Sequence, residues 1–367
     1  MAERKIVTLL LLLVTLVHSQ QVDSTHKKGK SIFYYPLIFY TPETELAFGC
    51  GGIFTFRTSK NQGSNPSQIG SVSYYTTNQQ YLITINPELY VKANRYYISA
   101  GIAYANLMDK FYGIGNHTRD IPDAAYYTSR FGLLLNIQRR ALLAPIGNLF
   151  RNINFGLILD FASDRIADKK DNPYLLERQV RGTEGGITSG MGYTMVWDTR
   201  DNIFFPHSGS YHQWKHVFFC APLGSDYDFN QYILDLRRYF PLAKDQVLGI
   251  QFYNNNTGGY PPFYRLPALG GGVLMRGYYQ GRYRDQNYMM AQLEYRMIVW
   301  WRVGLAVFTA TGDVAPQLRD FQLNEFKYSA GFGLRFVLDV IEKLDMRLDF
   351  GFGKKTSGVY VAIQEAF

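Results

Sequence analysis

Near its C-terminal end, the sequence alternates between apolar side chains and charged or small ones. One set of alternate positions in the segment 344–352 is wholly apolar. The other set carries Asp345, Arg347 and Asp349, with glycine after them. Because successive side chains of a β-strand point to opposite faces, this segment predicts a strand with one apolar and one charged face. In a soluble sandwich the charged face would meet bulk water, whereas in a membrane barrel it would line the lumen.

The same alternation recurs along the chain, and the number of strands separates the two architectures. A sandwich rarely needs about sixteen strands, whereas outer-membrane barrels of bacteria have an even number. The sequence therefore predicts an all-β fold, a single 16-stranded antiparallel transmembrane β-barrel. The expected strands are Ser31–Tyr40, Glu45–Thr58, Gly70–Thr77, Tyr81–Ala93, Tyr96–Leu107, Thr128–Leu143, Asn152–Ser163, Ile187–Asp201, Gly209–Ala221, Asp228–Phe240, Gln246–Asn256, Asn287–Trp300, Arg302–Asp313, Lys327–Asp339, Lys343–Gly353 and Ser357–Phe367.

The N-terminal residues have the layout of a secretory signal peptide. Arg4 and Lys5 precede an apolar run of about twelve residues, which is too short for the ~20 residues that a spanning helix needs. We therefore expect a signal peptide over 1–20, a short periplasmic segment over 21–30, the barrel over 31–367 and a location in the bacterial outer membrane. The longest expected connectors, 108–127, 164–186 and 257–286, all fall on one side, which is typical of the extracellular loops of such barrels.

Composition excludes several classes of function. The net charge of +8 would suit nucleic acid, but a secreted barrel has no access to it, so outer-membrane lipid and lipopolysaccharide are the expected partners. The six histidines lie at no spacing that suits a metal site, and no catalytic set is visible. We expect no enzyme, no cofactor and no metal, and two unpaired cysteines at Cys50 and Cys220.

The connector before Asn287 has the most informative local sequence. The loop has a glycine run, Gly270, Gly271 and Gly272, which lets its backbone approach the barrel wall closely. The run precedes the tip Met275-Arg276-Gly277-Tyr278. A guanidinium at such a tip can bind a carboxylate through two nitrogens. The pattern predicts a long loop folded into the lumen and held there by Arg276, either as a plug or as a gate. The similar Val180-Arg181-Gly182 lacks a glycine run, which indicates a solvated arginine.

Side-chain alternation supplies one wall residue for this loop. Met290, Gln292, Glu294 and Arg296 form the inward set of their strand, so Glu294 is expected to face the lumen. Asp198 and Arg200 are also expected to point inward, near the periplasmic rim.

Four motifs and the terminal residue resemble those of the BamA/TamA family of outer-membrane proteins, also called bacterial surface antigens. The Gly-rich run with Met275-Arg276-Gly277-Tyr278 is similar to the family's Val-Arg-Gly-Phe/Tyr loop. A terminal Phe367 resembles the family's assembly signal. The other matching segments are the strand–turn motif Asp198, Arg200, Asp201, Asn202, Pro206 and Gly209, the Glu-Tyr-Arg at 294–296, and Phe308–Val314.

The resemblance implies that Arg276 contacts acidic residues of the barrel wall. Glu294 is one implied partner. The family's second acidic position is held here by Ala310, so the contact rests on Glu294 alone or Asp313 substitutes. Members usually carry periplasmic POTRA domains, for which we see no room, so the chain resembles a barrel-only member.

The function implied is help with the insertion or translocation of proteins or lipids at the outer membrane. A periplasmic or outer-membrane protein partner, or a second copy of the chain, would replace the POTRA domains. A lateral seam is expected between 31–40 and 357–367, weakened by Pro36, which lacks a ladder donor. The alternatives are a plugged passive pore, a structural barrel without insertase activity, and a soluble secreted β-protein.

Overall fold

The computed structural model describes residues 30–41, 45–59, 63–121, 124–141, 152–169, 171–178 and 180–367. The expected signal peptide and nearly all of the segment 21–30 lie outside the described residues. Among the residues described, no helix is both long and apolar enough to cross a membrane.

The strands form one 16-stranded antiparallel sheet in which each strand pairs with its neighbours in the chain. This confirms the strand number and order expected from the alternation. The strands are β1 (Ser31–Thr41), β2 (Glu45–Phe56), β3 (Ser67–Thr76), β4 (Tyr81–Val91), β5 (Tyr96–Lys110), β6 (Ala125–Arg140), β7 (Ile153–Ala167), β8 (Gly185–Asp198), β9 (Gly209–Phe219), β10 (Phe229–Ala243), β11 (Gln246–Gly259), β14 (Asn287–Trp300), β15 (Val303–Ala315), β16 (Lys327–Asp339), β17 (Leu344–Gly353) and β18 (Thr356–Ile363).

The remaining elements are short and lie between the strands. β12 (Ala268–Leu269) and β13 (Tyr283–Arg284) pair with each other inside the connector from β11 to β14. The helical turns are α1 (Pro173–Leu176), η3 (Ala221–Leu223), η4 (Phe263–Arg265), η5 (Leu318–Asp320) and η6 (Leu323–Glu325).

Several expected strand ends differ from the structure by a few residues, and two of these differences have a clear local cause. β8 stops at Asp198 rather than Asp201, because the Asn202 side chain accepts the N–H groups of Phe204 and Phe205 and closes a turn. The last strand stops at Ile363 rather than Phe367. Gln364 adopts a positive φ of 75°, which turns the final residues out of the strand direction.

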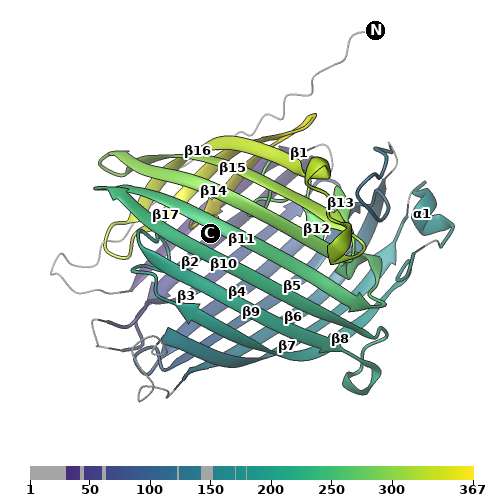
Figure 1. Cartoon of the computed structure of the whole chain (residues 1–367), viewed down its shortest axis with the longest axis horizontal. Coiled ribbons are helices and arrows are strands. Elements are labelled where there is room, and N and C mark those ends of the chain that lie inside the picture. Colours follow the sequence, from purple (N-terminus) through teal and green to yellow (C-terminus); the bar gives the residue numbers. More distant parts are fainter. Residues whose placement is uncertain are drawn as a thin grey trace, which may run out of the picture.

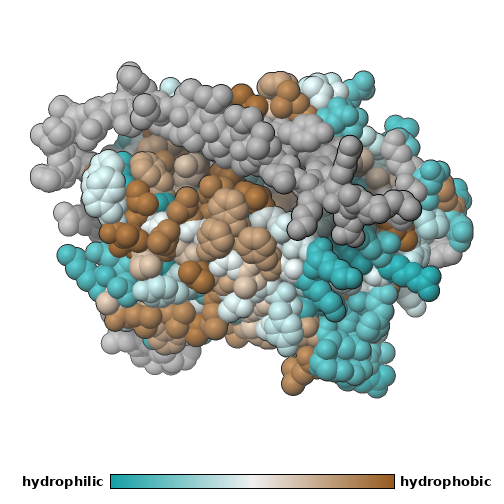
Figure 2. All heavy atoms as spheres, turned by 90° about the horizontal axis from the view of Figure 1, so that it is seen from above, coloured by the Kyte–Doolittle hydropathy of each residue, from teal (hydrophilic) through white to brown (hydrophobic). Residues whose placement is uncertain are grey.

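The two faces of the sheet differ in chemistry. On β14, Leu293 is 43% exposed while its neighbour Glu294 is fully buried. Val307 and Phe332 continue the exposed apolar face, and Arg335 and Asp349 continue the buried charged face. Figure 2 shows apolar side chains gathered over the middle of one side, with hydrophilic ones towards the part that holds β12, β13 and α1.

The sheet curves so that β8–β11 pass in front of the strands at the N-terminal end of the sheet (Figure 1). The connectors 92–95, 199–208, 244–245 and 340–343 lie at one end of the strands, which we call the short-turn end. The connectors 111–124, 168–184 and 260–286 lie at the other end, the long-loop end. The long connectors thus share one side, as the sequence predicts.

β1 and β18 are the two edges of the sheet, and their described residues form ladders only with β2 and β17. At the short-turn end the edges approach each other through side chains. The Ser31 hydroxyl donates to Asp339 of β16 at 2.9 Å, and Ile363 of β18 packs against the buried cluster that contains Phe33 of β1 and Leu344 of β17.

Candidate functional site

The tip of the loop 260–286 is buried against the charged face of the sheet. The Arg276 guanidinium contacts Glu294 on β14 through Nη2 and Asp349 on β17 through Nη1, the latter at 2.6 Å. The side chains of Arg276, Glu294 and Asp349 are all fully buried. The Arg276 Cζ also lies 3.5 Å from the centre of the Phe308 ring, a cation–π contact.

Further arginines share these two carboxylates. Arg296 donates to Glu294 at 2.6 Å. Arg335 and Arg347 each donate to Asp349 at 2.6 Å. Because each carboxylate accepts from several guanidinium groups, neither buried carboxylate is left without a cationic partner.

Glycine on both partners lets the loop backbone touch the sheet. A Cβ at Gly277 would lie 2.7 Å from the backbone of Phe352, and a Cβ at Gly351 would lie 2.7 Å from the backbone of Arg276. The Gly277 N–H donates to the Tyr360 hydroxyl at 2.9 Å. The Arg276 side chain therefore reaches Asp349 because the tip lies directly on β17.

The other part of the loop contacts strands far from β14 and β17 in the sheet. The hydroxyl of Tyr279 donates to Asp109 on β5 at 2.9 Å, and that of Tyr126 on β6 donates to the same carboxylate. Burial, and then the neighbouring Asp109 carboxylate, raise the pKa of Tyr279, which therefore remains a proton donor. Arg282 donates to Thr118 in the connector 111–124. The loop thus links β5 and β6 to β14 and β17.

The expectation that Asp313 could hold Arg276 is wrong. Glu294 lies opposite Phe308 in the ladder of β14 and β15, and Asp313 is five residues farther along β15. At ~3.4 Å per residue this is roughly 17 Å away. Asp313 instead forms an ion pair with Lys327 at 2.6 Å and accepts from Asn116.

Asp349 provides the second acidic contact, and the sequence reasoning did not identify it as a partner. The alternation placed Asp349 on the charged face, but only the positions of the loop and β17 show which carboxylate meets Arg276. Ala310, where the family pattern has an acidic residue, is 4% exposed in an apolar cluster with Met275 and Tyr278. A carboxylate there would face apolar side chains.

The strand–turn motif organises the turn 199–208. Asp198 forms an ion pair with Arg200 at 2.7 Å, and Asp201 accepts from the backbone N–H groups of His207 and Ser208. Gly209 has a φ of 98°, and a Cβ there would lie 2.1 Å from the Thr199 oxygen. Pro206 lines the cavity described next. The motif residues therefore shape a turn and its surroundings.

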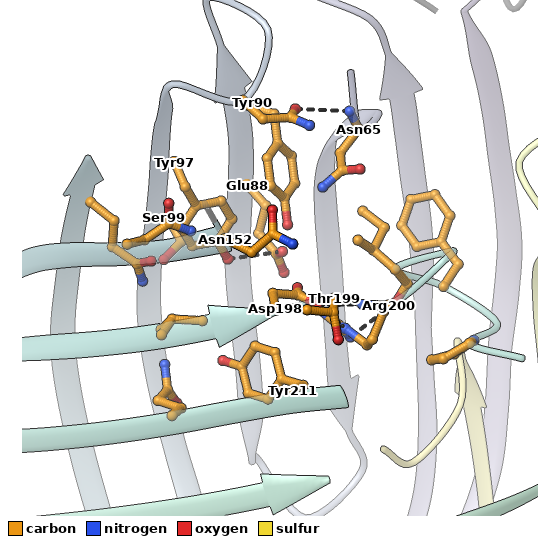
Figure 3. Close-up of a pocket in the computed structure, with 18 of the residues that line it drawn as sticks. Asn65, Glu88, Tyr90, Tyr97, Ser99, Asn152, Asp198, Thr199, Arg200 and Tyr211 are labelled. Carbon is orange, nitrogen blue, oxygen red and sulfur yellow. Dashed lines mark hydrogen bonds and ion pairs between the residues drawn. The ribbon is translucent and has the colours of Figure 1, made fainter. Parts of the chain in front are cut away.

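A polar cavity of about 720 Å³ lies at the short-turn end, beside this turn. Figure 3 shows Tyr97 and Glu88 joined by a hydrogen bond of 3.0 Å, with Asp198 and Arg200 on another side of the cavity. Asn136, which is 7% exposed, lines the cavity with an amide oxygen that has no hydrogen-bond partner among the residues described. Polar groups are thus available inside this end of the sheet, while loops cover the other end.

The turn 199–208 and the last residues of the chain meet at this end. Phe205 packs in a buried cluster with Phe367, Tyr239 and Val247. The backbone oxygen of Phe367 accepts from Arg296 at 2.7 Å. Phe367 is therefore connected to the arginine cluster through Arg296.

Comparison with known proteins identifies the family. The Omp85 superfamily domain matches residues 47–362. No curated protein matches the chain by sequence. Among solved structures, BamA from Haemophilus ducreyi lacking POTRA domains 1-3 is 15% identical, with 92% of this chain and 70% of that chain covered and a TM-score of 0.55.

CdiB from Acinetobacter baumannii is 10% identical, with 92% of this chain covered and a TM-score of 0.56. The chain spans 60% of the length of that CdiB chain. At these identities the two structures show a shared fold, which agrees with the 16-stranded sheet described here. Since the family match extends over most of the sheet, the chain belongs to the Omp85 superfamily and has its β-barrel fold.

Proposed function

We propose that the chain is an outer-membrane β-barrel that assists the insertion or translocation of proteins or lipids by opening between β1 and β18. The observation that carries this proposal is the contrast between the edges and the other strands. Each internal strand has two ladder partners, whereas the described residues of β1 and β18 have one each. Separating β1 from β18 would therefore break side-chain contacts, but it would not break a backbone ladder between the described residues.

Side chains at the short-turn end provide a defined closed state for this seam. Arg57, which follows β2, forms a two-nitrogen ion pair with Glu342 between β16 and β17, with Nη2 to Oε2 at 2.6 Å. Asn202 of the turn 199–208 donates to the Glu342 backbone oxygen at 3.0 Å. Phe204 of the same turn packs with Phe33 and Leu344. Because Ile363 of β18 packs against the same cluster, these contacts hold both edges to one turn.

The apolar and charged faces support the same placement. A barrel in a bilayer needs an apolar outer surface, and charged side chains are tolerated where they face its interior. The loop 260–286 contacts the charged face of β14 and β17 and also reaches β5 and β6. In a barrel, a loop with these contacts lies within the lumen and obstructs it.

Reconstitution tests the proposal. A purified, unfolded client β-barrel is added to liposomes that contain the chain or are empty, and folding is followed by the shift of the client band on unheated gels. We expect the chain to accelerate folding of the client. Equal rates in both liposomes would overturn the proposal.

A second function, a passive pore closed by the loop, is favoured by the complete burial of Arg276. In that case Arg276→Ala should raise single-channel conductance in planar bilayers and leave client folding at the rate seen without the chain. Conductance unchanged by the substitution would count against the pore.

The proposed activity needs no catalytic residue and no cofactor, but it does need capture of a client. We propose that a periplasmic or outer-membrane protein, or a second copy of this chain, contributes to capture. Outer-membrane lipid and lipopolysaccharide would surround the barrel. Co-purification in mild detergent, with and without chemical cross-linking, would identify a protein partner or give the mass of the chain alone.

A further inference from the structure

The outward face of β8, β9 and β10 carries an apolar hollow near the short-turn end. These strands lie side by side in the wall nearest the viewer in Figure 1. The hollow measures about 350 Å³. Its lining side chains include Met195, Trp197, His212, Trp214, Leu234 and Leu236.

The ladder register explains why the hollow forms there. Trp197 lies opposite His212, and His212 lies opposite Leu236, so these residues form one row across three strands. Met195, Trp214 and Leu234 form the next row. The rings of Trp197 and His212 are in edge contact, with centroids 4.9 Å apart. The space between the rows is therefore walled by rings and branched aliphatic chains.

A basic group stands at the short-turn side of the hollow. Arg238 lies opposite Ser210, one row beyond His212 and Leu236, and is exposed. Its Nη1 donates to the Ser210 hydroxyl at 2.9 Å, and its Cζ lies 5.3 Å from the Phe240 ring centre. These contacts orient the guanidinium on the outward face and leave its other nitrogens without a protein acceptor in the described residues.

Charge on this wall selects the kind of ligand. The outward positions of β8, β9 and β10 hold no carboxylate. A ligand bound here thus meets a cation at one end and apolar rings at the other. An acyl chain fits the hollow by its chemistry, and a phosphodiester next to it suits an arginine with free donors. Tryptophan at this level is also typical of membrane–water interfaces.

We propose that this wall binds one anionic glycerophospholipid, with its phosphate on Arg238 and an acyl chain in the hollow. The inference rests on the outer-membrane placement given under Proposed function. Because the hollow lies at the short-turn end, the lipid belongs to the periplasmic leaflet. The site lies on the opposite face of the sheet from the arginine cluster, so it does not require an open lumen.

The tryptophans of the chain make a direct test possible. The sequence has four, of which Trp197 and Trp214 line the hollow, while Trp300 and Trp301 lie at the turn between β14 and β15. Replacing Trp300 and Trp301 with Phe leaves tryptophan fluorescence only from the hollow, which excitation at a wavelength that tyrosine does not absorb isolates. Vesicles with bromine-labelled acyl chains, either on phosphatidylglycerol or on phosphatidylcholine, then report which lipid occupies it.

We expect phosphatidylglycerol to be preferred about fivefold, as one basic residue near the surface provides. Arg238→Gln should reduce this ratio to one. Arg139→Gln is the matched control, because Arg139 is exposed on β6 at the same end and next to inward-facing Gln138 and Arg140. It should leave the ratio unchanged.

A ratio of one in the parent, or a fivefold ratio that persists in Arg238→Gln, would overturn the phosphate site. Leu234→Phe, which fills the hollow, should lower quenching by both lipids, and unchanged quenching would overturn the acyl site. Vesicle flotation separates this inference from the proposal on which it rests. A chain that floats with the vesicles but shows no preference contradicts only the lipid site, and one that does not float contradicts the membrane placement itself.

Discussion

At the scale of single residues, Arg276 has the greatest effect on how the loop is held. Its side chain is fully buried between Glu294 and Asp349. Removing one member of a buried ion pair typically costs ~3–5 kcal/mol. Arg276→Ala should therefore release the tip, and trypsin should cleave within 270–286 many times faster than in the parent.

Arg181→Ala is the control for this substitution. Arg181 lies in a similar Val-Arg-Gly sequence, but it is exposed and stacks over Tyr260. Cleavage of the loop 260–286 should be unaffected by its loss. If Arg276→Ala and Arg181→Ala gave the same cleavage rate as the parent, Arg276 would not be holding the loop.

Gly351 tests the contact of backbone with backbone. A methyl group there would lie 2.7 Å from the carbonyl carbon of Arg276, which cannot move without displacing the tip. We expect Gly351→Ala to reproduce the cleavage of Arg276→Ala even though every charge is kept. Gly258→Ala provides the comparison, since a Cβ at Gly258 meets nothing within 4 Å. Protection of the loop in Gly351→Ala would contradict the close approach.

Part of this site could be predicted from the sequence. Alternation alone put Glu294 on the charged face, and it is there that Arg276 makes one of its contacts. Asp349 could not be assigned from the sequence. It lies 73 residues from Arg276, and their contact depends on how the loop lies across the sheet. Asp313 does not reach Arg276, because it lies five residues along β15 from Phe308, the residue opposite Glu294.

At the scale of elements, the ion pair of Arg57 and Glu342 joins the connector after β2 to the turn before β17, and so spans the seam between β1 and β18. Its side chains are only 11% and 6% exposed, so solvent screens it weakly. Arg57→Glu or Glu342→Arg should each lower the thermal midpoint of unfolding in detergent. The double charge reversal should recover most of the loss, with a coupling energy of about 1–3 kcal/mol.

The exposed pair Lys169 and Glu184 is the control for this cycle. Glu184 is 62% exposed, and surface pairs contribute ~0–1 kcal/mol. Reversing both charges there should leave the midpoint unchanged. A coupling energy near zero for Arg57 and Glu342 would mean that this pair does not hold the edges together.

Long strands were predictable, and short elements were not. A segment of ten or more alternating residues shows which side chains share a face and where the alternation stops. β14 and β16 therefore have the bounds expected from the sequence. β12 and β13 have two residues each and pair across the loop tip. No periodicity exists in two residues, so only the folded loop brings them together.

At the scale of the whole molecule, the even number of strands and the positions of the connectors agree with the expectation from sequence. Loops gather at one end, and the polar cavity lies at the other. What alternation could not predict is how the edges meet, because side chains of the turn 199–208 and of both edges contribute. The proposed function requires this seam to open.

Cross-linking the seam tests that claim most directly. In a chain with Cys50 and Cys220 replaced by Ser, cysteines at Arg57 and Glu342 are joined by a short reducible reagent, and client folding in liposomes is measured. The control joins cysteines at Val72 and Thr84, which lie opposite each other within the ladder of β3 and β4. We expect the seam cross-link to abolish acceleration and its reduction to restore it, while the control has no effect. Acceleration that persists with the seam cross-linked would show that the seam does not need to open.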